Sequence, residues 1–377
     1  MSTLVLPRAR RIGHDLTDLA NRPNALYGTA MLRIGYALAY LIFLLRELPH
    51  REQLWGPNAA WTPALEDQYA ANAHWYGWIK SWNTLLATTS DTRFELGYAI
   101  ALLICAAMVL GWHTRAASVG FMLVVTTFTA RDVFLGDGGD NVLLLMSIYL
   151  VFTACGRRAS LDSRRPAARA AAPRELAGQA LAELAEVRRR VVALIHNAAI
   201  LVIGFQMCVI YGAAALWKAQ GPVWQNGTAL YYVLHINWFR AWPGLSDTIA
   251  GHSTMIAIVA YLTVFAQIGF PFAVFSKKLK YTLLVILLGM HLSIAVLLGI
   301  PEFSAVMIIG DSVFLPDTFW LAAGRLVRTI AAHLLRRRPE PAWTAPGGGE
   351  LAALQDSDGS PAIQAESDQA LDPSAAM

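Results

Sequence analysis

The chain contains a succession of apolar runs, most of them close to the length that crosses a lipid bilayer as a helix. About 20 helical residues cover the ~30 Å of hydrocarbon in a bilayer. About eight runs approach that length in this sequence. The sequence therefore predicts an all-α protein, a polytopic transmembrane helix bundle of about eight spans.

The predicted spans differ in how clearly they end. The second, third, fourth and eighth are short or interrupted, so their bounds are the least defined. In order, the spans are residues 26–45, 95–110, 116–130, 142–155, 191–216, 255–275, 279–298 and 303–321.

The composition excludes a soluble globular protein. Of the 377 residues, 56% are hydrophobic and 15% are charged, and the mean hydropathy is +0.43, whereas charged residues approach a quarter of a soluble domain. The net charge of +4 would weakly indicate nucleic-acid binding in a soluble chain, but the arginines gather in loops between apolar runs. We therefore expect a lipid bilayer, and no nucleic acid, around this chain.

The distribution of Lys and Arg predicts the orientation. Basic residues accumulate before the first run, within 157–190, at 277–280 and after the eighth run, and eight spans would bring all of them to one side. The positive-inside rule makes that side cytoplasmic. Both termini are then cytoplasmic in the inner (plasma) membrane, and residues 47–93, 131–141 and 217–253 face outward.

The composition also divides the chain into regions. Residues 1–24 have no apolar run that could form a signal peptide, so we expect a cytoplasmic N-terminal segment. Residues 25–338 form the transmembrane domain, in which the pattern at 174–190 predicts an amphipathic interfacial helix within the cytoplasmic loop 157–190. Residues 339–377 are rich in Pro, Gly, Ala, Ser and acidic residues, which predicts a disordered cytoplasmic tail.

Lys218 is the first candidate for chemistry. The chain has five lysines and elsewhere mostly uses Arg, a group that cannot give up its proton as an ammonium can. Lys218 ends an apolar run and precedes an aromatic stretch that holds Gly227, so a membrane mouth lined by Trp217, Trp224 and Tyr231 is expected. A neutral amine there can act as a general base. The alternative is a lysine that snorkels at the interface.

Four further ionisable residues are predicted at membrane depth, where such groups are costly and mark functional sites. Arg33 and His291 lie inside spans, Asp140 opens the fourth span and Asp311 lies in the last. Each also has a structural explanation. Arg33 can snorkel or pair with a carboxylate, and Asp311 can be the internal counter-ion of Arg33 or of another cation. Asp140 can cap its helix, and His291 can be satisfied inside the bundle.

The sequence gives no sign of a metal or disulfide site. Cys105, Cys155 and Cys208 fall in apolar segments without a CxxC pair, which is typical of packing residues. No nucleotide-binding or metalloprotease motif is present. We expect no metal.

Three motifs resemble one family. VIYGAAALWK at 209–218 and WQNGTALYYVL at 224–234 resemble the motif around the catalytic lysine of vitamin K-dependent gamma-carboxylase. The stretch 291–307, beginning HLSIAVLLGI, is similar to the later histidine-led helix of that family. GGD at 138–140, ahead of an apolar run, and SLD at 160–162 look like the bacterial HTTM-domain proteins, which include the sporulation-delaying-protein B branch.

The resemblance implies an activity and a set of residues. It implies that Lys218 deprotonates a reduced quinone of the vitamin K or menaquinone type, and that His291 stands at the position of the family histidine. Asp140 stands where the carboxylase has a histidine, and the large extracytoplasmic domain of the carboxylase has no counterpart here, so quinol chemistry is expected rather than glutamate carboxylation. The predicted catalytic residues are Lys218 and His291, and the predicted substrate-binding residues are Arg33, Asp140, Trp217, Trp224, Gly227 and Tyr231.

Two other functions fit the same sequence. A non-catalytic membrane partner in the maturation of, or immunity to, a secreted peptide is implied by the sporulation-delaying branch. A transporter is the third alternative, because spanning segments alone do not name a chemistry.

The predicted orientation can be tested by thiol labelling in intact cells. A cysteine introduced at Asn226 should react with an impermeant thiol reagent, and one at Ser163 should be protected, because positive-inside places 157–190 in the cytoplasm. The unmodified chain, with its three native cysteines, is the control. Labelling at Ser163 with protection at Asn226 would reverse the orientation.

Overall fold

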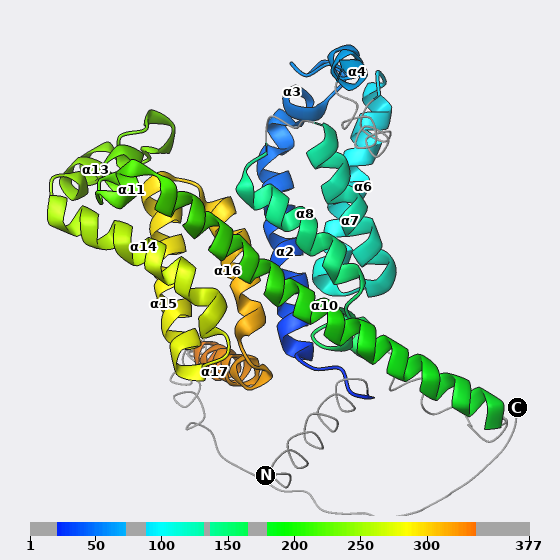
Figure 1. Ribbon diagram of the computed structural model, residues 1–377. Helices are drawn as coiled ribbons and strands as arrows, with labels where there is room; N and C mark the ends of the chain where they lie inside the picture. The colour runs from blue at the N-terminus through cyan, green and yellow to red at the C-terminus, as the bar shows by residue number, and fades with distance from the viewer. Residues whose placement is uncertain (1–20, 73–87, 132–135, 165–178, 337–377) are drawn as a thin grey trace, which may run out of the picture. The chain divides into compact units, whose positions relative to one another are not determined.

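The described part of the chain is entirely helical. The computed structural model describes residues 21–72, 88–131, 136–164 and 179–336, and every regular element in them is a helix (Figure 1). This confirms the predicted all-α class. The predicted tail 339–377 and nearly all of segment 1–24 lie outside the described residues. The chain divides into two units, residues 1–324 and 325–377, which are considered separately.

Long helices form most of the first unit, and short ones connect them. The long helices are α2 (Leu26–Glu47), α6 (Asp91–Leu110), α7 (Thr114–Arg131), α8 (Gly138–Val151), α10 (Gln179–Gln220), α14 (Ser253–Ala273), α15 (Lys277–Ser293), α16 (Pro301–Asp311) and α17 (Asp317–Arg336), which continues into the second unit. The short helices are α3 (Arg51–Trp55), α4 (Pro63–Asn72), α11 (Pro222–Gln225), α12 (Ala229–Leu234) and α13 (Pro243–Ala250).

Several of these helices can cross a membrane. In the described part of the chain, five helical segments are long and apolar enough to cross a membrane, and they contain α2, α6, α10, α14 and α15. The bent pair of α16 and α17 is a sixth candidate if it counts as one span. The helix α8 is shorter than a full crossing. The structure thus supports several spans, while the predicted number of about eight stays a prediction.

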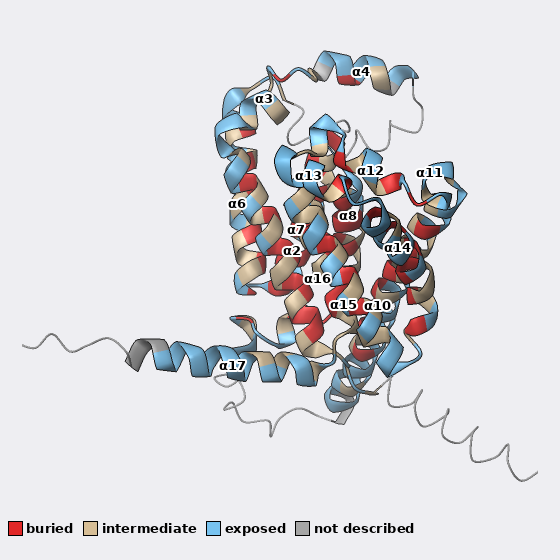
Figure 2. Cartoon of the chain, turned by 90° about the vertical axis from the view of Figure 1, so that its left-hand side faces the viewer, coloured by how far each residue is buried: buried red, intermediate tan, exposed pale blue. Residues whose placement is uncertain are grey.

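The surfaces of these helices fit hydrocarbon. Their buried residues face the interior, and long stretches of the outer faces are exposed (Figure 2). The exposed side chains in the middle of the long helices include large apolar ones, among them Leu103, Leu201, Phe205, Phe265 and Val285. Exposed apolar surface of this extent marks contact with a membrane or with another protein. A lipid bilayer is compatible with all of it.

The eighth predicted run is not one continuous helix. α16 ends at Asp311, a 3₁₀ turn covers Ser312–Phe314, and α17 begins only at Asp317, where the chain bends. Pro316 explains the break, because proline has no N–H for the helix and disfavours helical conformation in the residue before it. Leu315 is indeed extended.

The predicted interfacial helix and the fifth span form a single helix in the described residues. α10 is continuous from Gln179 to Gln220. No Gly or Pro separates the basic stretch from the apolar run that begins at Val191. Glu186 forms ion pairs with Arg189 and Arg190, one turn further along, which supports the helix across the junction.

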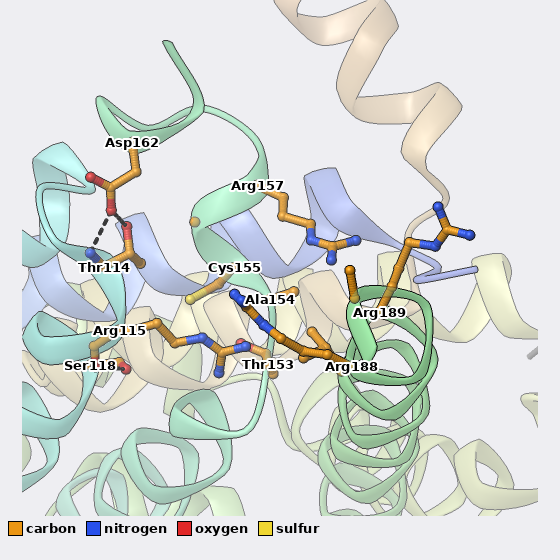
Figure 3. A pocket seen from close by; sticks show the side chains of 13 residues that line it. Thr114, Arg115, Ser118, Thr153, Ala154, Cys155, Arg157, Asp162, Arg188 and Arg189 are labelled. Carbon is orange, nitrogen blue, oxygen red and sulfur yellow. Dashed lines mark hydrogen bonds between the residues drawn. The ribbon is translucent and has the colours of Figure 1, made fainter. Parts of the chain in front are cut away.

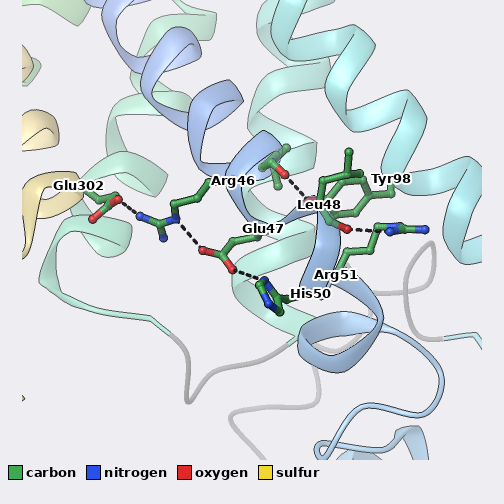
Figure 4. A network of polar contacts seen from close by, with 8 residues as sticks. Arg46, Glu47, Leu48, His50, Arg51, Tyr98 and Glu302 are labelled. Carbon is green, nitrogen blue, oxygen red and sulfur yellow. Dashed lines mark hydrogen bonds and ion pairs between the residues drawn. The ribbon is translucent and has the colours of Figure 1, made fainter.

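The helix α2 lies against α6 and α16, and polar contacts secure its C-terminal end (Figure 4). The Tyr98 hydroxyl of α6 donates to the carbonyl of Leu44 at 2.6 Å. Arg46 forms an ion pair with Glu302 of α16. The hydrogen bond joins α2 to α6 and the ion pair joins α2 to α16, so this end of α2 is held from two sides.

A buried arginine joins the other half of α2 to α6. The Arg33 guanidinium is fully buried and donates to the carbonyls of Met108, Val109 (2.9 Å) and Ala159 (2.6 Å). α6 ends at Leu110, and the next residue, Gly111, takes a φ of +67° that glycine readily adopts. The last carbonyls of a helix lack intrahelical donors, so Arg33 caps α6. The alternatives of snorkelling and of pairing with Asp311 are wrong, since Arg33 is fully buried and its two Nη atoms bind these carbonyls.

Replacing Arg33 should destabilise the protein. Arg33→Met removes the donor to three carbonyls, of which only that of Met108 keeps another, the N–H of Gly111. Each of the two unsatisfied groups costs about 1–3 kcal/mol, so a loss of about 2 kcal/mol or more is expected in thermal or denaturant unfolding in mild detergent. Arg46→Met, on the same helix but 50% exposed in its side chain, should cost about 1 kcal/mol or less. Equal losses for both variants would contradict the capping role.

Candidate functional site

Lys218 lies near the end of α10 and contacts two other elements. Its Nζ donates to Oε1 of Gln267 on α14 at 2.9 Å, and lies 5.5 Å from the centroid of the Trp224 ring on α11. Gln267 is buried although it lies inside an apolar helix. In the described residues no carboxylate forms an ion pair with Lys218. The amine is therefore held by a neutral acceptor and an aromatic face.

Gln267 connects Lys218 to the helix that carries His291. Its Nε2 contacts Sδ of Met290 on α15 at 3.5 Å, and His291 is the next residue along the chain. His291 is buried, and it lies within electrostatic range of Lys218. The two residues predicted to be catalytic are thus brought to one region of the bundle, although they do not contact each other directly.

Tyr211 extends this region toward Asp311. It precedes Lys218 by seven residues on α10, a spacing of two turns that places both on one face. Its hydroxyl lies 3.1 Å from Nε2 of His291 and donates to Oδ2 of Asp311 at 2.8 Å. We call Lys218, Gln267, His291, Tyr211 and Asp311 the polar line. It joins side chains of four helices, α10, α14, α15 and α16.

The hydrogen bonds at Tyr211 allow two proton arrangements. With Asp311 ionised and His291 protonated on both ring nitrogens, the hydroxyl donates to the carboxylate and accepts from Nε2–H. With Asp311 protonated, both hydrogen bonds reverse, Nε2 of His291 becomes the acceptor, and the neutral imidazole keeps its proton on Nδ1. A proton can therefore pass between the carboxyl and the imidazole through one hydroxyl, without movement of heavy atoms.

Several buried polar atoms around the polar line have no protein partner. Nδ1 of His291, Oδ1 of Asp311 and the hydroxyl of Tyr36 accept or donate no hydrogen bond within the described chain. A Cβ at Gly310 would come within 2.9 Å of the Tyr36 hydroxyl and 2.7 Å of the Met207 sulfur. The glycine therefore permits close packing of α2, α10 and α16 at this point.

A conformational irregularity follows His291. Ile294–Leu298 form a π-helical segment (η7), after which Gly299 takes a φ of +71°. Such insertions in α-helices frequently occur at functional sites. The apolar run 279–298 gave no sign of this change of geometry.

Asp140 lies in a different place from Lys218. It caps α8 in a reciprocal pair with Asp137, whose backbone N–H donates to Oδ2 of Asp140 at 2.7 Å. It also lines a cavity of about 450 Å³, between α2, α8 and α16, that Arg46 and Phe303 share. The ring centroids of Phe303 and His291 lie 5.8 Å apart, so Phe303 borders both the cavity and His291.

The structure assembles part of the predicted substrate-binding set. Trp224 contacts Lys218, whereas Trp217 is 76% exposed. Tyr231 packs on His235 with ring centroids 4.3 Å apart. Gly227, with a φ of +75°, brings its loop close to α14. Arg33 caps α6 and takes no part in the polar line.

Two members of the polar line were not singled out from the sequence. Gln267 is an amide within the apolar run 255–275, which was the available signal. Tyr211 stands within the lysine motif, at the spacing that shares a helix face with Lys218. The described part of the chain contains no cluster of three His, Cys, Asp or Glu residues that could hold a metal ion.

Comparison with known proteins adds no name to this site. No family model, curated protein or solved structure matches the chain. The resemblance to the gamma-carboxylase family stays a prediction from the motifs. Any functional proposal therefore depends on the polar line together with that resemblance.

The coupling of Tyr211 and Asp311 is measurable. Tyr211→Phe removes a buried donor to the carboxyl, so a loss of about 1–3 kcal/mol in unfolding free energy is expected. Together with Asp311→Leu in a double-mutant cycle, the coupling energy should be about 0.5–3 kcal/mol. Tyr149→Phe, which loses a 3.3 Å bond to Gln206, is the control. Additive effects of Tyr211→Phe and Asp311→Leu would show that the two residues act independently.

Proposed function

We propose that this protein is a membrane enzyme that takes a proton from a lipid-soluble hydroxyl compound of the quinol type, with Lys218 as the general base. The polar line is the observation that carries the proposal. Ionisable groups at membrane depth are costly and mark substrate sites or proton relays. Here Lys218 is connected through Gln267 and Met290 to the region of His291 and Asp311.

The residues around Lys218 fit a phenolic hydroxyl. A neutral amine accepts its proton, the Gln267 carbonyl orients the amine, and the Trp224 ring offers a face against which an aromatic ring can stack. A reduced quinone, of the menaquinone or vitamin K type, would supply reducing equivalents. The apolar surroundings suit a hydrophobic molecule that enters from the bilayer.

His291, Tyr211 and Asp311 would handle protons behind the base. The reversible hydrogen bonds of Tyr211 let a proton pass between His291 and Asp311. All three side chains are buried, which keeps water from exchanging protons with them during that transfer. In this proposal His291 lies near Lys218 and exchanges a proton with Asp311 through the Tyr211 hydroxyl.

A second function is favoured by the aromatic surface around the same mouth. Trp238 is 92% exposed, and Trp217, Tyr232 and Trp242 are also exposed on the segment 217–253. Exposed aromatic side chains of this kind serve as membrane-interface anchors or as protein contacts. A non-catalytic partner that handles a secreted peptide would use this surface, and the polar line would then join helices.

Substitution of Lys218 separates a base from an anchor. Lys218→Arg keeps charge and approximate reach but cannot accept a proton, so it should reduce quinol-dependent oxygen consumption by roughly 100-fold or more, the usual contribution of a general base. Lys218→Ala should lose a similar amount. Lys280→Arg is the matched control, because Lys280 also lies over an aromatic ring, that of Tyr281.

The outcome decides between the two functions. Expression and thermal unfolding should remain near those of the parent chain, and mass spectrometry of lipids that co-purify should find a quinone. If Lys218→Arg keeps quinol activity within a few-fold, Lys218 is an anchor and the catalytic proposal fails. A co-purifying peptide without a quinone would favour the second function.

A further inference from the structure

A basic pocket lies at the opposite end of α10 from Lys218. It has a volume of about 400 Å³ and forms where α7, the turn η4 (Cys155–Arg157) and the first turns of α10 meet (Figure 3). Its floor consists of small buried residues: Thr114, Ser118, Thr153, Ala154 and Cys155. Its rim consists of arginines: Arg115, Arg157, Arg188 and Arg189.

Three of these arginines bring charge that no carboxylate in the pocket compensates. Arg115, Arg157 and Arg188 reach into the space from three separate elements (Figure 3), and no described carboxylate forms an ion pair with them. The fourth, Arg189, is paired with Glu186. Partial burial and then the nearby charge of Arg115 lower the pKa of Arg157.

Among the described residues that line the pocket, the one carboxylate is that of Asp162, and it already accepts hydrogen bonds. Asp162 accepts from the backbone N–H of His113 at 3.1 Å, and from the N–H and hydroxyl of Thr114 at 2.6 and 2.7 Å. It therefore holds the start of α7 in place. Like charges that converge without a carboxylate are unfavourable unless an anion joins them.

We propose that this pocket binds a phosphate group. The planar guanidinium forms two parallel hydrogen bonds to phosphate oxygens, and three such groups from three elements match a single tetrahedral anion. Arg115, Arg157 and Arg188 are exposed and surround a floor of small buried residues, so an anion can reach all three from water.

The position of the pocket places the phosphate at a membrane surface. Arg188 and Lys218 are 30 residues apart on α10, which is about 45 Å of helix. A bilayer with its headgroups is about 40–45 Å thick, so the pocket lies at headgroup level when Lys218 lies at the other surface. The phosphate belongs either to an anionic phospholipid or to a soluble phosphate compound. This proposal is independent of the quinol activity.

The test compares two neighbouring arginines of α10 in the full chain. Arg188→Gln removes a pocket arginine, and Arg190→Gln removes an equal charge that lies outside the pocket and is paired with Glu186. The probes are inorganic phosphate, and phosphatidylcholine nanodiscs with or without phosphatidic acid. Binding is measured by native mass spectrometry and by thermal shift.

Arg188→Gln should weaken the affinity for the probe that binds the parent chain by roughly tenfold or more, as expected for the loss of a charge-assisted hydrogen bond. Arg190→Gln should change the same affinity by less than about threefold. Arg157→Gln is a second pocket variant and should repeat the loss. Binding of inorganic phosphate identifies a soluble compound, and binding of phosphatidic acid alone identifies a lipid headgroup. Absence of binding by both probes, or equal losses for Arg188→Gln and Arg190→Gln, overturns the proposal.

Discussion

Buried cationic and imidazole side chains hold the helix ends of this protein by hydrogen bonds to backbone groups. Arg33 caps α6, and Arg131 at the end of α7 donates to the carbonyls of Gly56 and Trp61 at 3.0 and 2.7 Å. His196 accepts from the N–H of Ala154 at 2.8 Å. Helix ends inside an apolar environment have no water to satisfy them, so these side chains are a condition for the rest of the packing.

The helix α10 relates the two candidate sites to that framework. It carries Arg188 at the basic pocket, His196 at the loop after α8, and Tyr211 and Lys218 on the polar line. A continuous helix fixes the separation of these groups, because its rise is constant at about 1.5 Å per residue. The distance between the basic pocket and Lys218 is therefore set by one element.

Much of the fold could be predicted because the apolar runs are long and the helical class follows from them. The break at Pro316 was not predicted, since the expected span 303–321 runs through it, although proline interrupts a helix. The capping pair Asp137 and Asp140 lies in a Gly-rich segment and has the spacing of a known N-terminal motif. That spacing favoured a cap for Asp140, alongside the predicted role in substrate binding.

The partners of buried groups could not be predicted in the same way. A helical period tells which residues share a face, but it does not tell which helix lies opposite. A pairing with Asp311 was one alternative for Arg33, because both are charged, yet Arg33 meets backbone carbonyls, which the sequence does not distinguish. Lys218 and His291 could be chosen from their residue types. The connection through Gln267 and Met290 depends on how α14 packs between α10 and α15.

The incomplete pairing of the polar line bears on whether it joins helices or performs chemistry. A polar cluster that only joins helices is most stabilising when every buried donor and acceptor is satisfied, and each one left over costs about 1–3 kcal/mol. Nδ1 of His291, Oδ1 of Asp311 and the Tyr36 hydroxyl are not satisfied by the described chain. Buried groups without partners are exceptional in proteins, and each one needs an explanation. In the proposed function these three atoms are where a proton or a polar substrate group would bind, whereas unsatisfied atoms elsewhere, such as Nε of Arg33, lie in structural contacts.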